Sequence, residues 1–306
     1  MTYYPEGVNK SLRRQFASME EIKQAIAQKN IYEGKVMLCD REHNLHLDLG
    51  IIRGIIPRCE GAVGIADGTV RDIALISKVG RWVCYRIAGL HRNKYGQTVA
   101  ILSRRIVQQE CQRRYIDLLS VGDIINARVT HLERFGAFID IGAGINSLIP
   151  IDMLSVSRIS HPCQRVSNGD TVSVLLRSRE EGKLTFSLKE LLGTWQENAD
   201  LFRVGETVTG VVRSVESYGV FVELMPNLAG LAELTDQVEI GQQVSVFIKS
   251  ILPDKMKIKL VIVDAFGQEG APQPPIYFEK GDHITHWVYS TPQSKKKIET
   301  HLNALL

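Results

Sequence analysis

The amino-acid sequence predicts a mainly β protein that contains three small five-stranded barrels in tandem. The first observation is an internal repeat, because the phrase RFGAFIDI at 134–141 returns 83 residues later as SYGVFVEL at 217–224. The second observation is the alternation of apolar and polar residues around both phrases, which is the period of half-buried strands. A repeat of this length indicates tandem copies of one structural unit.

The second copy is the clearest and is expected at residues 120–189. Ile125 and Val129 would face the core from its first strand, with polar residues between them. A third strand at 147–150 precedes a long connection, and the last of two further strands is expected at 183–188. Five short strands with the long gap after the third are typical of an OB-type barrel.

The other two copies depart from this pattern. The third copy is expected at 204–264. Up to its third strand it matches the second copy at a distance of 83 residues, but after that strand the distance is only 72. Most of the long connection should therefore be missing from it. The first copy, at 31–103, keeps an echo of the third strand at Gly54–Pro57 but has His43–His46 where the aromatic phrase would stand. We therefore expect the first barrel to be degenerate.

The remaining segments predict connectors. Residues 1–30 are expected to form a poorly ordered basic arm and then a short helix that begins in a capping-box sequence. Helical linkers are expected at 104–119 and 190–203. Residues 265–306 begin with a Gly/Pro-rich linker and should continue as a tail with a strand near 284–289 and a short closing helix.

Composition favours a cytoplasmic protein. The five cysteines are widely spaced, which is typical of reduced thiols, and no apolar run approaches the length of a membrane span. The formal net charge is only +3, so phosphate binding would have to rely on local basic patches. No membrane partner is expected.

The repeated motifs resemble the S1 RNA-binding domain of the ribosomal protein S1 family. The residues that carry the resemblance are Val121–Asp123, Phe135–Phe138, Gly144–Pro150, Gly169–Asp170, Lys183–Lys189, Val204–Glu206, Tyr218–Phe221, Gly230–Glu233 and Gly241. The tail at 281–300 resembles the end of short S1-related proteins of Clostridia-like bacteria. The resemblance implies single-stranded RNA binding in translation or mRNA handling, with mRNA, the 30S ribosomal subunit or RNA-processing proteins as partners.

In that family, two aromatic residues, a histidine, an acidic residue and a basic residue form the RNA surface. Here the histidine position holds Pro150 in the second copy and Glu233 in the third, and Ser178 stands at the acidic position of the second. The resemblance and the outward strand positions predict bases stacking on aromatic residues and phosphates meeting basic ones. The expected RNA-binding residues are Phe135, Phe138, Arg128, Arg134 and Lys183, extended in the third barrel by Tyr218, Phe221, Arg213 and Lys257.

Other interpretations remain open. The aromatic residues would also suit packing against a neighbouring barrel, and the weak net charge, with Glu223 and Glu233 near the third surface, favours a protein that docks on the ribosome or on RNA machinery with little RNA affinity. In that case the first barrel would be the docking module. The arginine-rich helix expected at 104–114 suits a phosphate backbone and a solvated face equally well.

We expect neither an enzyme nor a cofactor. The only long stretch outside the barrels and linkers, 265–306, lacks an acidic metal cluster. His283 and His286 lie near His301 and Glu299 in the sequence, but an His-x-x-His pair on one strand points its rings to opposite faces. The sequence therefore predicts no metal site in the tail.

Overall fold

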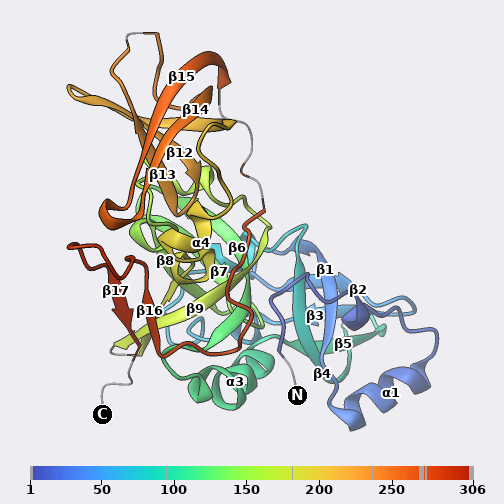
Figure 1. Cartoon of the computed structure of the whole chain (residues 1–306). Coiled ribbons are helices and arrows are strands. Elements are labelled where there is room, and N and C mark those ends of the chain that lie inside the picture. Colours follow the sequence, from blue (N-terminus) through green and yellow to red (C-terminus); the bar gives the residue numbers. More distant parts are fainter. Residues whose placement is uncertain are drawn as a thin grey trace. The chain divides into compact units, whose positions relative to one another are not determined.

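The computed structural model describes residues 3–93, 95–180, 182–235, 237–268, 272 and 274–302. Its strands form three closed five-stranded barrels and one two-stranded sheet (Figure 1), which confirms the predicted fold class. The chain divides into two compact units, one of residues 1–119 with 140–146 and the other of 120–139 with 147–306. Each unit is described separately below.

The first barrel lies in the first unit and has the strand order β1-β2-β3-β5-β4. A parallel pairing between β3 and β5 closes it, with Gly54 opposite Ala100. Alternate side chains of each strand fill its interior, as a half-buried strand requires. Its strands are β1 (Tyr32–Cys39), β2 (Leu45–Asp48), β3 (Arg53–Ile56), β4 (Trp82–Arg92) and β5 (Thr98–Ser103).

The N-terminal segment is packed, so the prediction of a poorly ordered arm is wrong for the residues described. Phe16 is only 2% exposed and exchanges backbone hydrogen bonds with Leu49 and Ile51. The basic composition of the segment obscured this apolar anchor. The segment contains η1 (Lys10–Leu12) and leads into α1 (Met19–Gln28), whose first turn is capped by Ser18.

Two of the arginines near α3 (Arg105–Arg114) hold the first unit together. The guanidinium of Arg104 is buried and donates to both carboxylate oxygens of Glu6, and Arg105 pairs with Glu60. Burial would raise the pKa of Glu6, but Arg104 and Lys78 outweigh that effect and lower it. These two arginines are therefore structural. The other short helices here are η2 (Arg58–Glu60), α2 (Ile73–Ile76) and η3 (Ile116–Leu118).

The second barrel has the strand order β10-β8-β7-β6-β9. It closes through a parallel pairing of Thr185 with Leu148. Inward residues such as Ile125 and Val129 are buried, as the alternation predicts. Its elements are β6 (Ile124–Glu133), β7 (Gly136–Asp140), β8 (Asn146–Pro150), η4 (Ile151–Met153), η5 (Pro162–Gln164), β9 (Thr171–Glu180) and β10 (Lys183–Ser187).

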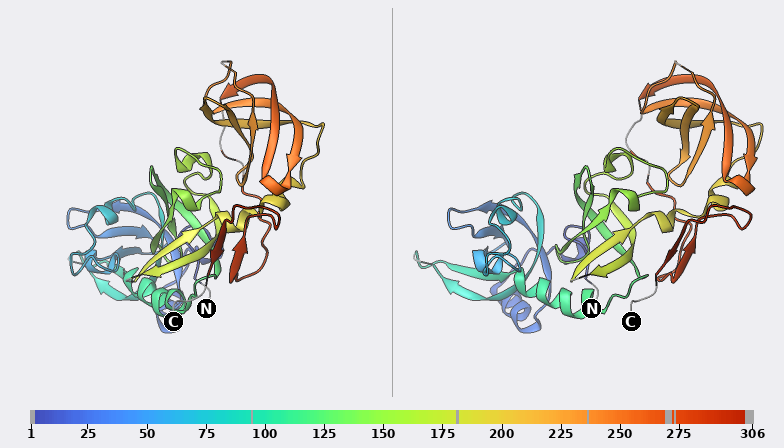
Figure 2. Two further views of the ribbon diagram at one scale, coloured as in Figure 1. Left: turned by 60° about the vertical axis from the view of Figure 1, so that its left-hand side comes forward. Right: turned by 90° about the vertical axis from the view of Figure 1, so that its left-hand side faces the viewer.

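The third barrel has the strand order β11-β12-β13-β15-β14, and Figure 2 shows these strands closing on themselves from two directions. Residues 233–241 alone join its third and fourth strands, whereas 151–170 make that connection in the second barrel. Its elements are β11 (Thr207–Glu216), β12 (Gly219–Met225), β13 (Leu228–Ala232), β14 (Gln242–Leu252), η7 (Pro253–Lys255) and β15 (Lys257–Gln268).

The connection between the second and third barrels contains less helix than the sequence predicts. It consists of η6 (Lys189–Leu192) and α4 (Trp195–Ala199), separated by Gly193 in a left-handed conformation with φ of 83°. A Cβ at Gly193 would also lie 2.7 Å from a ring carbon of Phe278, so a glycine is needed there.

The tail folds onto the second unit as a small sheet of β16 (His286–Val288) and β17 (Glu299–His301). Trp287 and Tyr289 are buried in the same apolar core as Trp195. Residues 299–301 form a strand, and the short closing helix expected at the end of the tail would fall partly on residues 303–306, which lie outside the described part of the chain. No helix in the described ranges is long and apolar enough to cross a membrane.

Candidate nucleic-acid interface

The second barrel presents the predicted pair of aromatic rings on its outer surface. Phe135 lies in the turn between β6 and β7 and is 57% exposed, and Phe138 follows on β7 and is half-buried. The ring centroids are 5.9 Å apart and the planes meet at 86°. This edge-to-face contact is favourable in itself and holds the two rings in a fixed arrangement.

A third ring, His131 at the end of β6, joins this pair and was not predicted. Its centroid lies 6.4 Å from that of Phe138, with the planes at 26°, and its Nε2 is 2.7 Å from a carboxylate oxygen of Glu133. Strict alternation along the strand would place His131 on the inward side with Val129. Instead its side chain is 60% exposed. We call His131, Phe135 and Phe138 the aromatic platform.

The third barrel indicates why alternation fails at this point. There the register between β11 and β12 shifts after Val212, so that Ser214 pairs with Phe221. The repeat offset of 83 makes Ser214 the counterpart of His131. A bulge of this kind inserts one extra residue and turns the following side chain to the other face. A bulge leaves no signal in the sequence pattern.

The glycine inside the aromatic phrase is needed for close strand packing. A Cβ at Gly136 would lie 2.4 Å from the carbonyl oxygen of Ile149, and one at Gly219 would lie 2.4 Å from that of Ala232. Both carbonyl groups belong to the neighbouring strand. A side chain in place of either glycine would therefore push the two strands apart. The repeated glycine therefore brings the platform strand against its neighbour.

Three predicted basic residues of the second barrel occupy different strands. Arg134 is exposed beside Phe135, and Lys183 is exposed at the start of β10. Arg128 lies on β6 opposite Thr171 in the register, with its guanidinium near Gly169. Arg134 is thus the basic residue closest in sequence to the platform, while Lys183 lies two strands away from β7 in the barrel order.

The third barrel repeats the aromatic pair but not the third ring. Tyr218 is 66% exposed, and its ring centroid is 6.1 Å from that of Phe221 with the planes at 89°. The register places Leu231 beside Phe221 and Lys259 beside Leu231. Lys257 is exposed two residues earlier, and Lys259 is an exposed cation that was not predicted. The alternation along β15 was a signal that would have found it.

Arg213 and Glu223 have a role different from the one expected. The guanidinium of Arg213 donates to both carboxylate oxygens of Glu223, and Arg165 donates to the same carboxylate. The side chain of Arg213 is only 7% exposed, so in this structure it is not placed to meet a phosphate. Glu223 is likewise buried and paired with both arginines, so it is not an exposed negative charge on this barrel. Glu233, in contrast, is exposed as expected.

In the first barrel, the histidines that replace the aromatic phrase face acids. The Nε2 of His46 is 2.9 Å from a carboxylate oxygen of Asp40, and the Nδ1 of His43 is 3.8 Å from one of Asp72. Both rings are therefore paired with carboxylates, and Asp72 also pairs with Arg58, so these histidines are occupied within the barrel.

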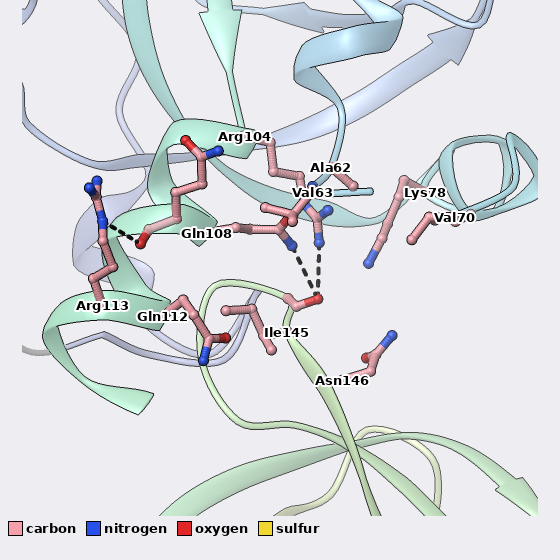
Figure 3. Close-up of a pocket in the computed structure, with 13 residues that line it drawn as sticks. Ala62, Val63, Val70, Lys78, Arg104, Gln108, Gln112, Arg113, Ile145 and Asn146 are labelled. Carbon is pink, nitrogen blue, oxygen red and sulfur yellow. Dashed lines mark hydrogen bonds between the residues drawn. The ribbon is translucent and has the colours of Figure 1, made fainter. Parts of the chain in front are cut away.

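The first unit also holds a pocket of about 560 Å³ beside α3 (Figure 3). Arg104 and Gln108 both donate to the carbonyl oxygen of Gly144 at its wall. Lys78 and Arg104, two of the three cations that line it, also pair with Glu6. The single carboxylate of Glu6 therefore offsets part of the positive charge at the pocket wall and holds two of its cations in place.

Comparison with known proteins gives the same class of domain. A family model for the S1 RNA binding domain matches residues 119–188. The small ribosomal subunit protein bS1 of Leuconostoc lactis is 32% identical over 178 residues, which are 52% of this chain and 41% of that protein. The small ribosomal subunit protein bS1 homolog of Bacillus subtilis is 28% identical over 258 residues, 79% of this chain and 65% of that protein.

Among solved structures, a multidomain protein with nucleic acid binding domains from Streptococcus pneumoniae aligns over 79% of this chain and 75% of its own, with 13% identity and a TM-score of 0.26. The aligned parts span less than two thirds of the length of the two ribosomal relatives. The sequence matches and the three barrels agree on the class of domain. Residues 119–188 match the S1 RNA-binding domain, and the chain is similar to small ribosomal subunit proteins bS1 over much of its length.

Proposed function

We propose that this protein binds single-stranded RNA, in translation or mRNA handling, and that the aromatic platform of the second barrel is its main contact. The observation that carries the proposal is the cluster of His131, Phe135 and Phe138 on one outer surface. Three exposed or half-exposed rings there have no role in the barrel core. They offer the flat apolar faces on which unpaired bases stack.

The platform would act by stacking. A base stacked on an aromatic side chain of such a barrel contributes about 1–3 kcal/mol. Phe135 offers the more exposed ring, and Phe138 is held between it and His131. Because every base has a π-face, we expect binding to tolerate many sequences. Base-paired RNA, whose bases are already stacked, should bind poorly.

Basic residues would hold the sugar–phosphate backbone beside the stacked bases. Arg134 and Lys183 are exposed, and Arg128 lies on the same barrel. In the third barrel Tyr218 and Phe221, with Lys257 and Lys259, extend the surface (Lys259 in place of Arg213). Two linked weak sites raise the effective concentration at the second contact, so neither needs to bind strongly alone. This is binding without covalent chemistry.

The test is the affinity of the full chain for a fluorescent single-stranded RNA of about 20 nucleotides. Replacing Phe135 by alanine should weaken binding roughly 5- to 150-fold, the equivalent of one lost stack. Tyr95→Ala is a control, because Tyr95 is an exposed aromatic ring on the first barrel, outside the platform. Unchanged affinity in a Phe135→Ala, Phe138→Ala double variant would overturn the proposal, as would equal affinity for a duplex.

A second candidate function rests on the first barrel, where exposed aliphatic side chains lie on β1, on α2 and just after α2. Met37 and Leu38 on β1, Ile73 and Ile76 on α2, and Val79 are all exposed. Backbone hydrogen bonds from Val36 to Arg81 and from Gly80 to Val36 hold the segment after α2 against β1. Exposed apolar groups of this kind mark protein contacts. We propose that this surface docks on the ribosome or on an RNA-processing protein.

Co-sedimentation with ribosomes after nuclease treatment tests the docking surface. An Ile73→Glu, Ile76→Glu variant should lose co-sedimentation while keeping its affinity for free RNA. The reverse result, loss of RNA affinity with co-sedimentation retained, would place the docking surface elsewhere.

A further inference from the structure

The outer face of the tail sheet brings together two histidines and a glutamate. His286 on β16 lies directly opposite His301 on β17, and Glu299 is two residues before His301 and so on the same face. The imidazole centroids are 4.3 Å apart and their planes meet at 9°. All three side chains are exposed to solvent.

The Nε2 atoms of both histidines lie beside the carboxylate of Glu299, each next to a different oxygen. The Nε2 of His286 is 3.2 Å from Oε2 of Glu299, and the Nε2 of His301 is 3.5 Å from Oε1 of the same carboxylate. One ligand atom from each residue lies within 4.8 Å of the other two. In a tetrahedral zinc site with bonds of about 2.0–2.1 Å, neighbouring ligand atoms are about 3.3 Å apart. The nitrogen–oxygen separations here are close to that value.

We propose that His286, His301 and Glu299 bind a divalent transition-metal ion, for which Zn²⁺ is the best fit. Two imidazoles and one carboxylate form a donor set that Zn²⁺ readily accepts, whereas Mg²⁺ and Ca²⁺ prefer oxygen ligands. A rotation of the two stacked imidazoles, which their exposed setting allows, would let the three side chains fill three tetrahedral positions and leave the fourth to water.

The inner face of the same sheet keeps the three ligands in place. Trp287 and Thr300 alternate with the ligands and are buried. The hydroxyl of Thr300 lies 3.1 Å from Glu190, and that of Tyr289 donates to the carbonyl oxygen of Asn227. A ligand set on a rigid strand pair binds metal without the cost of ordering a loop. The ion would in turn join β16 to β17.

His283 does not belong to this site. Its Nδ1 lies 2.7 Å from a carboxylate oxygen of Asp123 instead. His283 and His286 thus have different acidic partners, as their opposite directions along the chain suggest. The pairing of His286 with His301 depends on the register between two strands, which the sequence does not reveal. His283 therefore provides a matched control, because it is also an exposed histidine paired with an acid.

The test is a calorimetric titration of Zn²⁺ into the untagged, reduced and chelator-treated full chain. We expect one ion per chain, and binding at least about tenfold weaker in His286→Ala, in His301→Ala and in Glu299→Gln. His283→Ala should bind as the native chain does. Titration with Co²⁺ should give the visible absorption of tetrahedral coordination, and the same three variants should lose it. Each variant should keep its RNA affinity, which shows that it is folded and separates this site from the platform.

Two results would overturn the proposal. One is the absence of saturable one-to-one binding in the native chain. The other is binding that survives all three substitutions but is lost in Cys59→Ser, Cys163→Ser, because exposed thiols also bind Zn²⁺ and these are two such cysteines. The hydrogen-exchange rate of the β16 and β17 amides adds a readout in the native chain. Zn²⁺ should slow that exchange and leave exchange in the first barrel unchanged.

Discussion

The buried carboxyl of Glu33 should make the first unit less stable as pH rises. Glu33, the second residue of β1, is 2% exposed and accepts a hydrogen bond from the amide of Gly7 at 2.8 Å. Its other oxygen is 3.7 Å from Arg13. Burial, together with the negative charge of Glu6, raises the pKa of Glu33 to about 7, despite the amide and Arg13. Its ordinary value is 4.5.

The sign and size of the effect follow from that shift. A raised carboxyl pKa means that the folded state binds the proton more tightly than the unfolded state. The stabilising contribution is therefore complete below the unfolded pKa and is lost as pH rises toward about 7. One pKa unit corresponds to about 1.4 kcal/mol, so the free energy of unfolding should fall by about 3 kcal/mol at most across that window.

Glu33→Gln removes the titration while its amide oxygen can still accept from Gly7. The free energy of unfolding of the variant, minus that of the native chain, should therefore increase by about 3 kcal/mol at most between about pH 5 and about pH 8. Hydrogen exchange of the β1 amides in the full chain measures this difference. Comparing the two proteins at the same pH cancels the intrinsic exchange rate.

A constant offset between the two proteins would not matter, because only its change with pH reports on Glu33. A difference that stays level over this pH range would refute the reasoning, since it would mean that Glu33 titrates equally in both states. A difference of the opposite sign would mean that Arg13 governs the carboxylate and lowers its pKa.

Three further predictions concern the other two barrels. Lys183→Gln should make the plot of log affinity against log salt shallower by about 0.7, measured with single-stranded RNA, and an unchanged slope would exclude a phosphate contact. Glu223→Gln should destabilise the third barrel by about 3–5 kcal/mol, because two buried arginines lose their counter-charge. Hydrogen exchange of the β12 amides measures this loss, and the control Glu233→Gln should change the stability by less than about 0.5 kcal/mol. Gly136→Ala should weaken RNA binding and also reduce the protection of the β8 amides from hydrogen exchange. Gly89→Ala is the control and should change neither, because a Cβ there would meet no atom within 4 Å.

The sequence predicts the barrels well because their signals are local. Alternation with period two locates the strands, and the repeated glycine marks the place where β7 and β8 approach each other closely. The pairing of Phe135 with Phe138 follows from the same phrase. Each of these features depends on residues a few positions apart.

The features that the sequence did not predict depend on register or on distant partners. His131 departs from strict alternation at the position where the third barrel has a bulge. Arg213 is held by the carboxylate of Glu223, which Arg165, 58 residues away in the sequence, also contacts. His286 meets His301 only because two short strands pair in one register. Such contacts follow from the folded chain, and no spacing rule on a single strand gives them.

The most direct test of the central claim is photo-crosslinking of a 4-thiouridine single-stranded RNA to the full chain, with the crosslinked peptides identified by mass spectrometry. We expect the strongest crosslinks on the peptide that contains His131, Phe135 and Phe138, weaker ones around Tyr218 and Phe221, and loss of the former in the Phe135→Ala, Phe138→Ala variant. Crosslinks confined to the first barrel, or unchanged in that variant, would contradict the proposal that RNA lies on the aromatic platform.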